Sequence, residues 1–191
     1  MTEGPEVAVL IHELGGMLSS VQGFAHIAES NPGHKDRERY IKLAASEARR
    51  AALALKDLHL ARSLDRGGIP AAPPPVDLAE LLASVEGVDA AAAHGCMVRA
   101  DPSKLRGLLG RCLLAGVSGA RVSADGGGGA EIAVVLGPEA DLQRRKQALA
   151  APYPDMIPFS LMRRLLELWG GGLTLAAIDR DTVITLRFAG A

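Results

Sequence analysis

Two helical patterns occupy the first third of the chain. From about Pro5 to Ser30, apolar residues recur at alternating steps of three and four, which is the spacing of one helix face. After the breaker Asn31-Pro32-Gly33, a second such pattern runs from about Asp36 to Leu64. We therefore predict two antiparallel helices joined as a hairpin. The first face comprises Val7, Leu10, Leu14, Met17, Val21, Phe24 and Ala28, widened by Ile11, Leu18 and Ala25; the second comprises Ile41, Ala44 or Ala45, Ala48, Ala51 or Ala52, Leu55, Leu58, and Ala61 or Arg62.

A lone hairpin of this kind leaves apolar residues uncovered along both helices. Two helices seldom bury enough surface to be stable by themselves. Pairing two hairpins across a twofold axis completes a four-helix bundle and covers these residues. The sequence therefore predicts a homodimer.

The stretch from Gly67 to Pro75 is rich in glycine, alanine and proline, which predicts a linker. It divides the chain into a helical hairpin over residues 1–66, a linker over 67–75 and a second domain over 76–191. That domain is expected to place helices on one face of a largely antiparallel sheet, so the predicted fold class is α+β. The expected elements are a helix over Val76–Val85, a strand over Met97–Ala100, a helix from Asp101 to about Gly119, strands over Arg121–Ser123 and Glu131–Leu136 joined across Gly126–Gly129, a helix over Ile157–Trp169, and a hairpin of Leu173–Ala177 with Thr182–Phe188.

Composition excludes several classes of function. The chain has 191 residues, of which 48% are hydrophobic, and a net charge of -1. This balance lacks the basic excess of proteins whose main partner is nucleic acid. The N-terminus has no signal-peptide pattern and no run of 18 apolar residues occurs, which predicts a cytoplasmic protein without a membrane span. Cys96 and Cys112 form no CxxC pair and are expected to be small buried residues.

His12 is the first candidate for chemistry. It lies off the apolar pattern and is expected to face outward, beside the small residues Gly16, Ser19 and Gly23. Imidazole is a nucleophile near neutral pH, because much of it is unprotonated there. Gly15 and Gly16 cost roughly 1 kcal/mol each relative to alanine inside a helix, and close approach by a partner would explain that cost. A lone histidine of this kind is otherwise an ordinary solvated side chain.

The segment from His12 to Ala25 resembles the phosphoacceptor helix of sensor histidine kinases. That family's pattern is His-Glu-Leu-Arg-Thr-Pro-Leu, followed by an aliphatic-x-Gly-aromatic group. The resemblance implies that His12 is phosphorylated and that Glu13 assists as a base. It also argues against receiver-phosphatase activity, because Gly16 lacks the hydroxyl or amide that orients water in the family. This sequence keeps His12, Glu13, Leu14, Leu18, Val21, Gly23 and Phe24, and departs at Gly15, Gly16 and Met17.

The second domain resembles the ATP-binding domain of the same family, but without its nucleotide site. The family's two metal- and nucleotide-binding asparagines are replaced by Arg111 and Ala115, and its glycine-rich phosphate loop by Asp155–Phe159. No Asp-x-Gly-x-Gly loop occurs between Leu136 and Pro158. We therefore expect no cofactor and no ATP binding on this chain, and we expect magnesium to belong to the partner. The similar segments, in the family's order, are Val76–Leu82, Arg99–Leu109, Ser160–Gly171 and Leu173–Phe188.

These patterns predict a histidine phosphotransferase in a two-component phosphorelay. His12 would carry a phosphoryl group between aspartates of response-regulator or hybrid-kinase receiver domains, with Gly15, Gly16, Ser19 and Gly23 contacting the partner. Two alternatives stay open. One is a pseudokinase scaffold that binds a receiver or a kinase and regulates it without phosphotransfer. The other is an active kinase with an unusual nucleotide site.

Other polar residues suggest weaker hypotheses. A His-Glu-x-x-His zinc site is excluded, because the second histidine position holds Gly16. His26, two heptads after His12, is either a second phosphoacceptor or a solvated side chain. Arg37, Arg39, Arg49 and Arg50 are expected on a solvated face that could attract the acidic pocket of a receiver domain.

Overall fold

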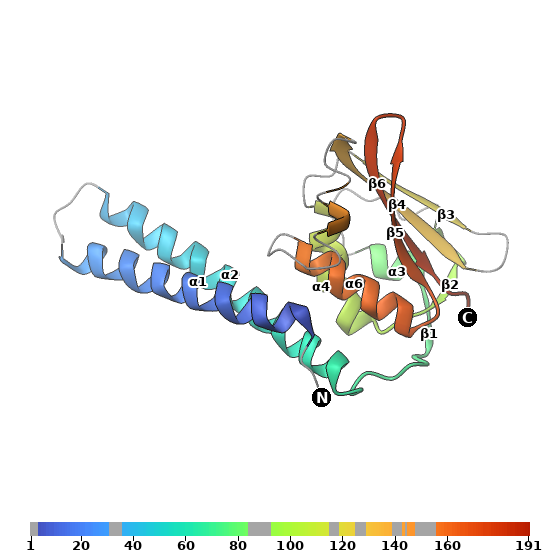
Figure 1. Ribbon diagram of the computed structural model, residues 1–191, viewed down its shortest axis with the longest axis horizontal. Coiled ribbons are helices and arrows are strands. Elements are labelled where there is room, and N and C mark those ends of the chain that lie inside the picture. The colour runs from blue at the N-terminus through green and yellow to red at the C-terminus, as the bar shows by residue number, and fades with distance from the viewer. Residues whose placement is uncertain are drawn as a thin grey trace. The chain divides into compact units, whose positions relative to one another are not determined.

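A computed structural model describes residues 4–30, 36–83, 93–114, 119–124, 129–138, 143, 145–147 and 156–191. The chain forms two compact units, Met1–Arg66 and Gly67–Ala191 (Figure 1). The first unit is a helical hairpin, and the second is an α/β unit built on an antiparallel sheet. This is the predicted α+β fold class.

The hairpin consists of α1 (Pro5–Ser30) and α2 (Arg37–Asp65), which pack along each other in antiparallel directions (Figure 1). At one end, the Gly4 amide donates a 2.8 Å hydrogen bond to Asp65 Oδ2. Toward the other end, the rings of Phe24 and Tyr40 stack at a centroid distance of 6.3 Å. Interpolating between these contacts places His12 at about the level of Leu53 to Lys56.

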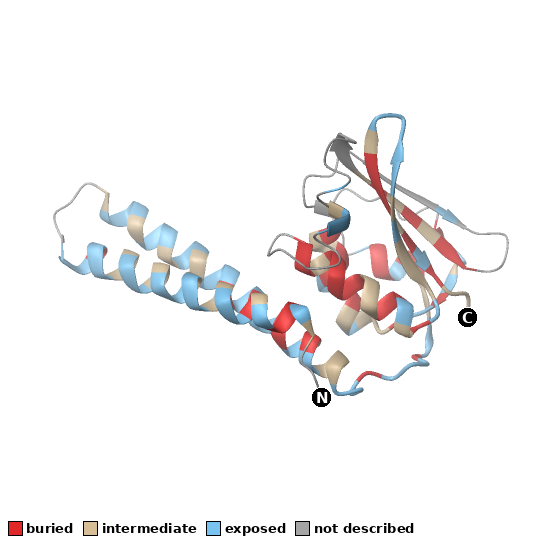
Figure 2. Cartoon of the chain, viewed as in Figure 1, coloured by how far each residue is buried: buried red, intermediate tan, exposed pale blue. Residues whose placement is uncertain are grey.

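Burial in the hairpin is concentrated at the end that holds the start of α1 and the end of α2 (Figure 2). Val7, Leu10 and Leu58 are buried there. Toward the loop, no described residue from Ile11 to Ile27 or from Arg37 to Arg50 is buried. The loop-end half of the hairpin therefore has almost no core of its own within one copy of the chain.

α2 presents two apolar faces, which the sequence pattern did not separate. One face packs toward α1 and holds the buried or half-buried side chains of Ala44, Ala51, Ala54, Leu58 and Ala61. The other face repeats at the same spacing but is exposed, and it comprises Ile41, Ala45, Ala48, Ala52 and Leu55.

α1 carries a matching exposed apolar face. Ile11 and Leu18, expected to widen the apolar face of the first helix, are 48% and 54% exposed and lie outside the face packed on α2. At 100° per residue they lie roughly a quarter turn away from that face. Ile11 and Leu18, together with the exposed apolar residues of α2, are called the apolar stripe below.

The two halves of the apolar stripe fall on one side of the hairpin. On each helix the exposed apolar face follows the packed face by roughly 100° in the same rotational sense. α1 and α2 run antiparallel and turn their packed faces toward each other. Turning by about 100° from the packed face, in the sense of each helix's own chain direction, therefore leads to the same side of the hairpin for both helices. The hairpin therefore offers one continuous uncovered apolar surface.

α1 is long and apolar enough to cross a membrane by length and composition alone, with a hydropathy of 1.2 over its most apolar window. A single helix of this kind near the N-terminus is weak evidence, because the core helix of a soluble protein passes the same test. The expectation that no segment spans a membrane therefore stays a prediction.

The second unit packs helices against a four-stranded antiparallel sheet (Figure 1). The sheet order is β3 (Gly119–Ala124), β4 (Ala130–Pro138), β6 (Asp181–Phe188) and β5 (Gly172–Ile178). A separate pair joins β1 (Pro75–Asp77) to β2 (Met97–Arg99). The helices are α3 (Leu78–Leu82), α4 (Pro102–Leu114) and α6 (Ile157–Leu168). Alternate strand residues meet the helices in the core, which includes Ile132, Val134, Ile184, Leu186, Leu105, Leu109, Leu161 and Leu165.

Two element predictions in this unit were wrong at their edges. The helix expected over Val76–Val85 begins at Leu78, because residues 75–77 pair with β2 and the Asp77 carboxylate accepts from Ala79 N at 2.8 Å. The helix expected to reach Gly119 ends at Leu114, and Gly119 pairs with Val135 in the sheet. Residues 126–128, in the expected strand connection, lie outside the described residues.

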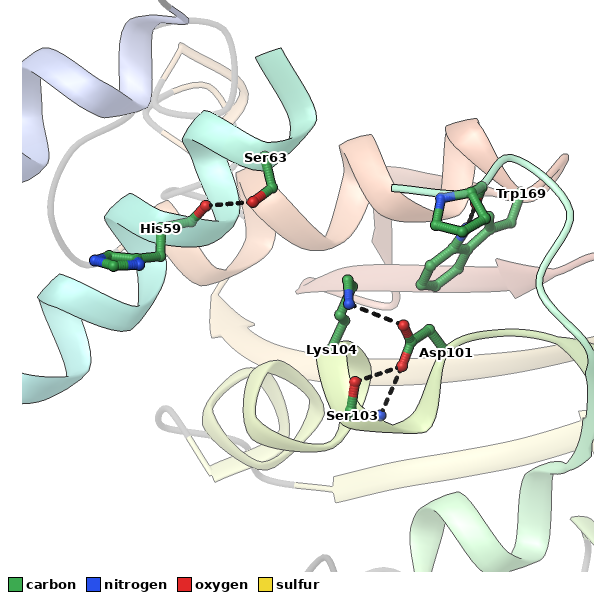
Figure 3. Close-up of polar contacts among 7 residues, drawn as sticks. His59, Ser63, Asp101, Ser103, Lys104 and Trp169 are labelled. Carbon is green, nitrogen blue, oxygen red and sulfur yellow. Dashed lines mark hydrogen bonds and ion pairs between the residues drawn. The ribbon is translucent and has the colours of Figure 1, made fainter. Parts of the chain in front are cut away.

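Asp101 begins α4 as a helix cap (Figure 3). Its carboxylate accepts hydrogen bonds from Ser103 N at 2.9 Å and Ser103 Oγ at 2.6 Å, and it pairs with Lys104 Nζ at 2.9 Å. Burial alone raises the pKa of Asp101, but the contacts with Ser103 and Lys104 outweigh it and hold the pKa below its ordinary value. The folded state therefore favours the ionised carboxylate.

We expect Asp101→Ala to lower the free energy of unfolding by about 1 kcal/mol at neutral pH, the usual contribution of a helix cap. Because the folded pKa is lowered, the carboxylate stabilises the fold above its ordinary pKa, and this stabilisation is lost as pH falls through the lowered value. Urea unfolding followed by circular dichroism at pH 7 and at about pH 2.5 tests this. A difference from wild type that does not shrink at the lower pH would contradict it.

The stretch predicted as a linker is held by the second unit. Ile69 is buried, and Trp169 Nε1 donates a 2.9 Å hydrogen bond to the Pro70 carbonyl (Figure 3). Pro75 then begins β1. Gly67 has a φ of +65°, a left-handed conformation that glycine adopts without strain, directly after the end of α2. The residues after Gly68 therefore belong structurally to the second unit.

Trp169→Phe removes the indole donor while keeping an aromatic ring in the same place. The Pro70 carbonyl then loses its partner in a partly buried position, so we expect the free energy of unfolding to fall by about 1–3 kcal/mol. Backbone amides of residues 67–75 should also exchange faster with deuterium. Unchanged exchange in this stretch would show that the hydrogen bond does not hold it.

Candidate functional site

His12 lies on an exposed strip of α1. His12, Gly16, Ser19, Gly23 and His26 recur at alternating steps of four and three, and all five are exposed. These residues, called the histidine strip below, lie roughly 100° around the helix from Ile11 and Leu18. The outward placement of His12 agrees with the sequence analysis, and its side chain is open to a large partner.

Glu13 is half-buried and lies beside His12 in the sequence rather than on the same face. Within the residues that the structure describes, no hydrogen bond joins the two side chains. The role of Glu13 as a base therefore stays a prediction. His26, farther along the strip, has its Nε2 atom 3.5 Å from Ser30 Oγ.

The glycines of this region are not required by packing within the chain. A methyl group built on Gly15, Gly16 or Gly23 would meet no atom within 4 Å. The two neighbouring serine hydroxyls bind the backbone of their own helix. Ser19 Oγ donates to the Gly15 carbonyl at 2.9 Å, and Ser20 Oγ donates to the Gly16 carbonyl at 3.0 Å. The result is a low, smooth stretch of helix surface beside His12.

Gly16→Ala is therefore expected to raise the free energy of unfolding by about 0.5–1 kcal/mol, because alanine favours the helix and has room for its methyl group. Urea unfolding of the full chain measures the change. A destabilised variant would show that another group covers this surface.

The residues described at the family's nucleotide position do not fit a magnesium-nucleotide complex. Arg111 stands where the resemblance places a metal-binding asparagine, and a guanidinium carries no acceptor for a cation. Its Nε donates to the Gly107 carbonyl of its own helix at 3.2 Å. Farther along, Met156 and Phe159 are 3% and 2% exposed, so these residues of the replaced phosphate loop are buried apolar groups. Ala115 and Asp155 lie outside the described residues.

The described residues support neither a metal site nor a site built on paired cysteines. In the described part of the chain, no three His, Cys, Asp or Glu side chains are grouped so as to hold a metal ion. Cys112 is buried as expected, Cys96 is half-buried, and both are free thiols.

Comparison with solved structures gives a consistent answer about the fold. The histidine kinase AdeS of Acinetobacter baumannii matches with a TM-score of 0.65 at 13% identity, over 93% of this chain and 97% of that one. The chain has a histidine-kinase fold. Full-length ShkA, solved in complex with AMPPNP, matches with a TM-score of 0.56 at 21% identity, over 97% of this chain and 46% of its own.

The likeness is one of structure alone. A bacterial phosphotransferase also matches, at 16% identity and a TM-score of 0.46, which is too low to carry an argument. No protein-family model and no curated protein matches the sequence. The fold therefore agrees with the resemblance of the His12 segment to histidine kinases. Any statement about activity has to be argued from the residues of the site.

Proposed function

We propose that the protein is a histidine phosphotransferase of a two-component phosphorelay, in which His12 takes a phosphoryl group from one receiver aspartate and passes it to another. The observation that carries this proposal is an exposed histidine on the hairpin of a histidine-kinase fold, beside a helix surface kept low by glycines. A receiver domain must bring its aspartate within bonding distance of the imidazole, which a low surface permits. Its partners are then response-regulator or hybrid-kinase receivers in the cytoplasm.

Nucleotide has no part in this proposal. Arg111 in place of a metal-binding asparagine, and buried Met156 and Phe159 in place of a phosphate loop, support a second unit that does not bind ATP. The magnesium ion needed for transfer to and from aspartate would belong to the receiver. On the chain itself, the imidazole nitrogen of His12 attacks the phosphorus, the aspartyl oxygen leaves as carboxylate, and the reverse reaction discharges the phosphohistidine.

The active form is proposed to be a homodimer. The loop-end half of the hairpin buries almost nothing, and the apolar stripe lies on one side, as a second hairpin would require. The histidine strip lies roughly 100° from that side, so dimer formation leaves His12 accessible.

The direct test uses the purified full chain and receiver domains of the same organism, radiolabelled on aspartate with acetyl phosphate. Label should move to this protein and should be stable to alkali but labile to acid, as a phosphohistidine is. Absence of label with every receiver would refute the proposal. Label taken directly from ATP would instead favour an unusual kinase, and receiver binding without label would favour a scaffold.

A further inference from the structure

The outer face of α2 carries a line of exposed basic side chains. Exposed residues recur there at alternating steps of three and four, and every charged one is positive. The residues are Arg39, Lys42, Ser46, Arg49, Leu53 and Lys56, called the basic stripe below. It spans about 26 Å along the helix and lies roughly 110° around α2 from the apolar stripe. A second hairpin that covers the apolar stripe therefore leaves the basic stripe open.

The charge of the basic stripe is only partly neutralised within the chain. Lys42 pairs with Glu38 at 2.7 Å. Within the residues that the structure describes, Arg39, Arg49 and Lys56 form no ion pair. The other acidic groups of α2 are engaged elsewhere: Glu47 binds Arg50 at 2.8 Å, Asp65 accepts from Gly4 N at 2.8 Å, and Asp57 is buried.

Of the two described helices of the hairpin, only α2 carries lysine and arginine. Between Pro5 and Ser30, α1 contains Glu6, Glu13 and Glu29 but no lysine or arginine. The two helices thus present opposite signs, and the positive field extends outward from one flank of the hairpin. A one-sided field of this kind attracts a partner of opposite charge and orients it before contact.

We propose that the basic stripe is the docking surface for an acidic face of the receiver domain that exchanges phosphoryl with His12. The inference rests on the proposed function. Phosphorylation replaces the single negative charge of the receiver aspartate with about 1.5 to 2 negative charges at pH 7, beside the carboxylates that hold its magnesium. Leu53 and Lys56 lie at about the level of His12 along the hairpin. Within one hairpin the basic stripe faces away from α1 and the histidine strip faces away from α2, so in the proposed dimer the twofold axis brings the basic stripe of each hairpin to the side on which the other presents its histidine strip.

Two features favour a protein partner over nucleic acid or a lipid surface. Leu53 is 42% exposed between Arg49 and Lys56 on the stripe, and an exposed apolar side chain of this kind suits the core of a protein interface. Near the start of α2, Glu38, Arg39, Lys42 and Leu43 line a hollow of about 380 Å³. Of its lining side chains, Lys42 already pairs with Glu38, and Arg39 is placed to meet a projecting acidic side chain.

The test compares two triple variants of the full chain with the same change in charge. Arg39→Glu/Arg49→Glu/Lys56→Glu reverses the basic stripe, whereas Arg99→Glu/Arg106→Glu/Arg180→Glu reverses three exposed arginines of the second unit. For each, receiver binding is measured by fluorescence anisotropy, and label transfer is measured against receiver concentration at low and high salt. The probe for binding is one unphosphorylated receiver domain. It is the receiver that exchanges label fastest with the wild-type protein or, if no receiver exchanges label, the receiver that binds the wild-type protein most tightly.

The stripe variant should bind the receiver at least tenfold more weakly at low salt and should lose most of the salt dependence seen in wild type. Its transfer rate at saturating receiver should stay within about twofold of wild type, because His12 is unchanged. Equal receiver affinities of the two triple variants would overturn the inference. It would also be overturned if the stripe variant lost binding to DNA or to anionic vesicles while keeping its affinity for the receiver. Absence of label on wild type would instead refute the proposed function, since the binding measurement does not need transfer.

Discussion

His12→Gln should abolish phosphoryl transfer, with labelling falling by roughly 10³-fold or more to background. The reason is chemical: without the imidazole no phosphohistidine forms, and the amide of glutamine is not a nucleophile. The side chain is exposed, so the substitution should change the free energy of unfolding by less than about 0.5 kcal/mol. Label transfer from a phosphorylated receiver, with circular dichroism to confirm folding, measures both effects.

His26→Gln is the matched control, because it changes a second exposed histidine of the same strip. It should transfer label at the wild-type rate. Equal labelling of wild type and the His12 variant would reject His12 as the acceptor. If both single variants label but the double variant does not, His26 is a second acceptor.

Leu55→Glu should convert the dimer into a monomer. Leu55 is 47% exposed in the isolated hairpin, and a second hairpin on the apolar stripe would cover it. Fully burying a leucine contributes about 1.5–3 kcal/mol, so covering the exposed half of Leu55 contributes roughly half of that, and twofold symmetry loses it twice, which is about 1.5–3 kcal/mol per dimer before the cost of covering two carboxylates. The dissociation constant should then rise by roughly 10 to 10²-fold or more, as sedimentation over a concentration series would show.

Leu53→Glu is the control, because it makes the same chemical change two residues away at a similar exposure of 42%. Leu53 lies on the basic stripe, so this variant should remain a dimer. A monomeric wild type, or equal weakening by both variants, would contradict the assignment of the apolar stripe as the dimer interface.

Much of the hairpin was predictable because its pattern is long and periodic. The bounds of α1 and α2 lie within one residue of the prediction, and the outward position of His12 follows from the same periodicity. The two faces of α2 could not be separated, since alanine at neighbouring positions such as Ala44 and Ala45 gives no contrast between buried and exposed sides. Only the packing of α1 against one face of α2 shows which of its two apolar faces is buried.

In the second unit, short elements and distant contacts limited the prediction. β1 has three residues and is defined by its pairing with β2, which no local pattern reveals. The hydrogen bond from Trp169 to Pro70 joins residues 99 positions apart, so composition alone predicted a free linker. The basic stripe was predicted only in part. Of the four arginines expected on a solvated face, Arg39 and Arg49 belong to it, and Lys42 and Lys56 join them in one line only once the packed face of α2 is known.

The scarcity of buried side chains between Ile11 and Ile27 has a consequence for how the cell could control this protein. In the proposed dimer, a helix pair that takes part of its core from a second molecule is stabilised by mass action, so the ordered fraction would rise with the amount of protein made. Halving expression would then lower relay output more than twofold wherever the concentration is near the dissociation constant. Under the proposed function, gene dosage would then act more steeply than in proportion, at most as the square of the amount of protein.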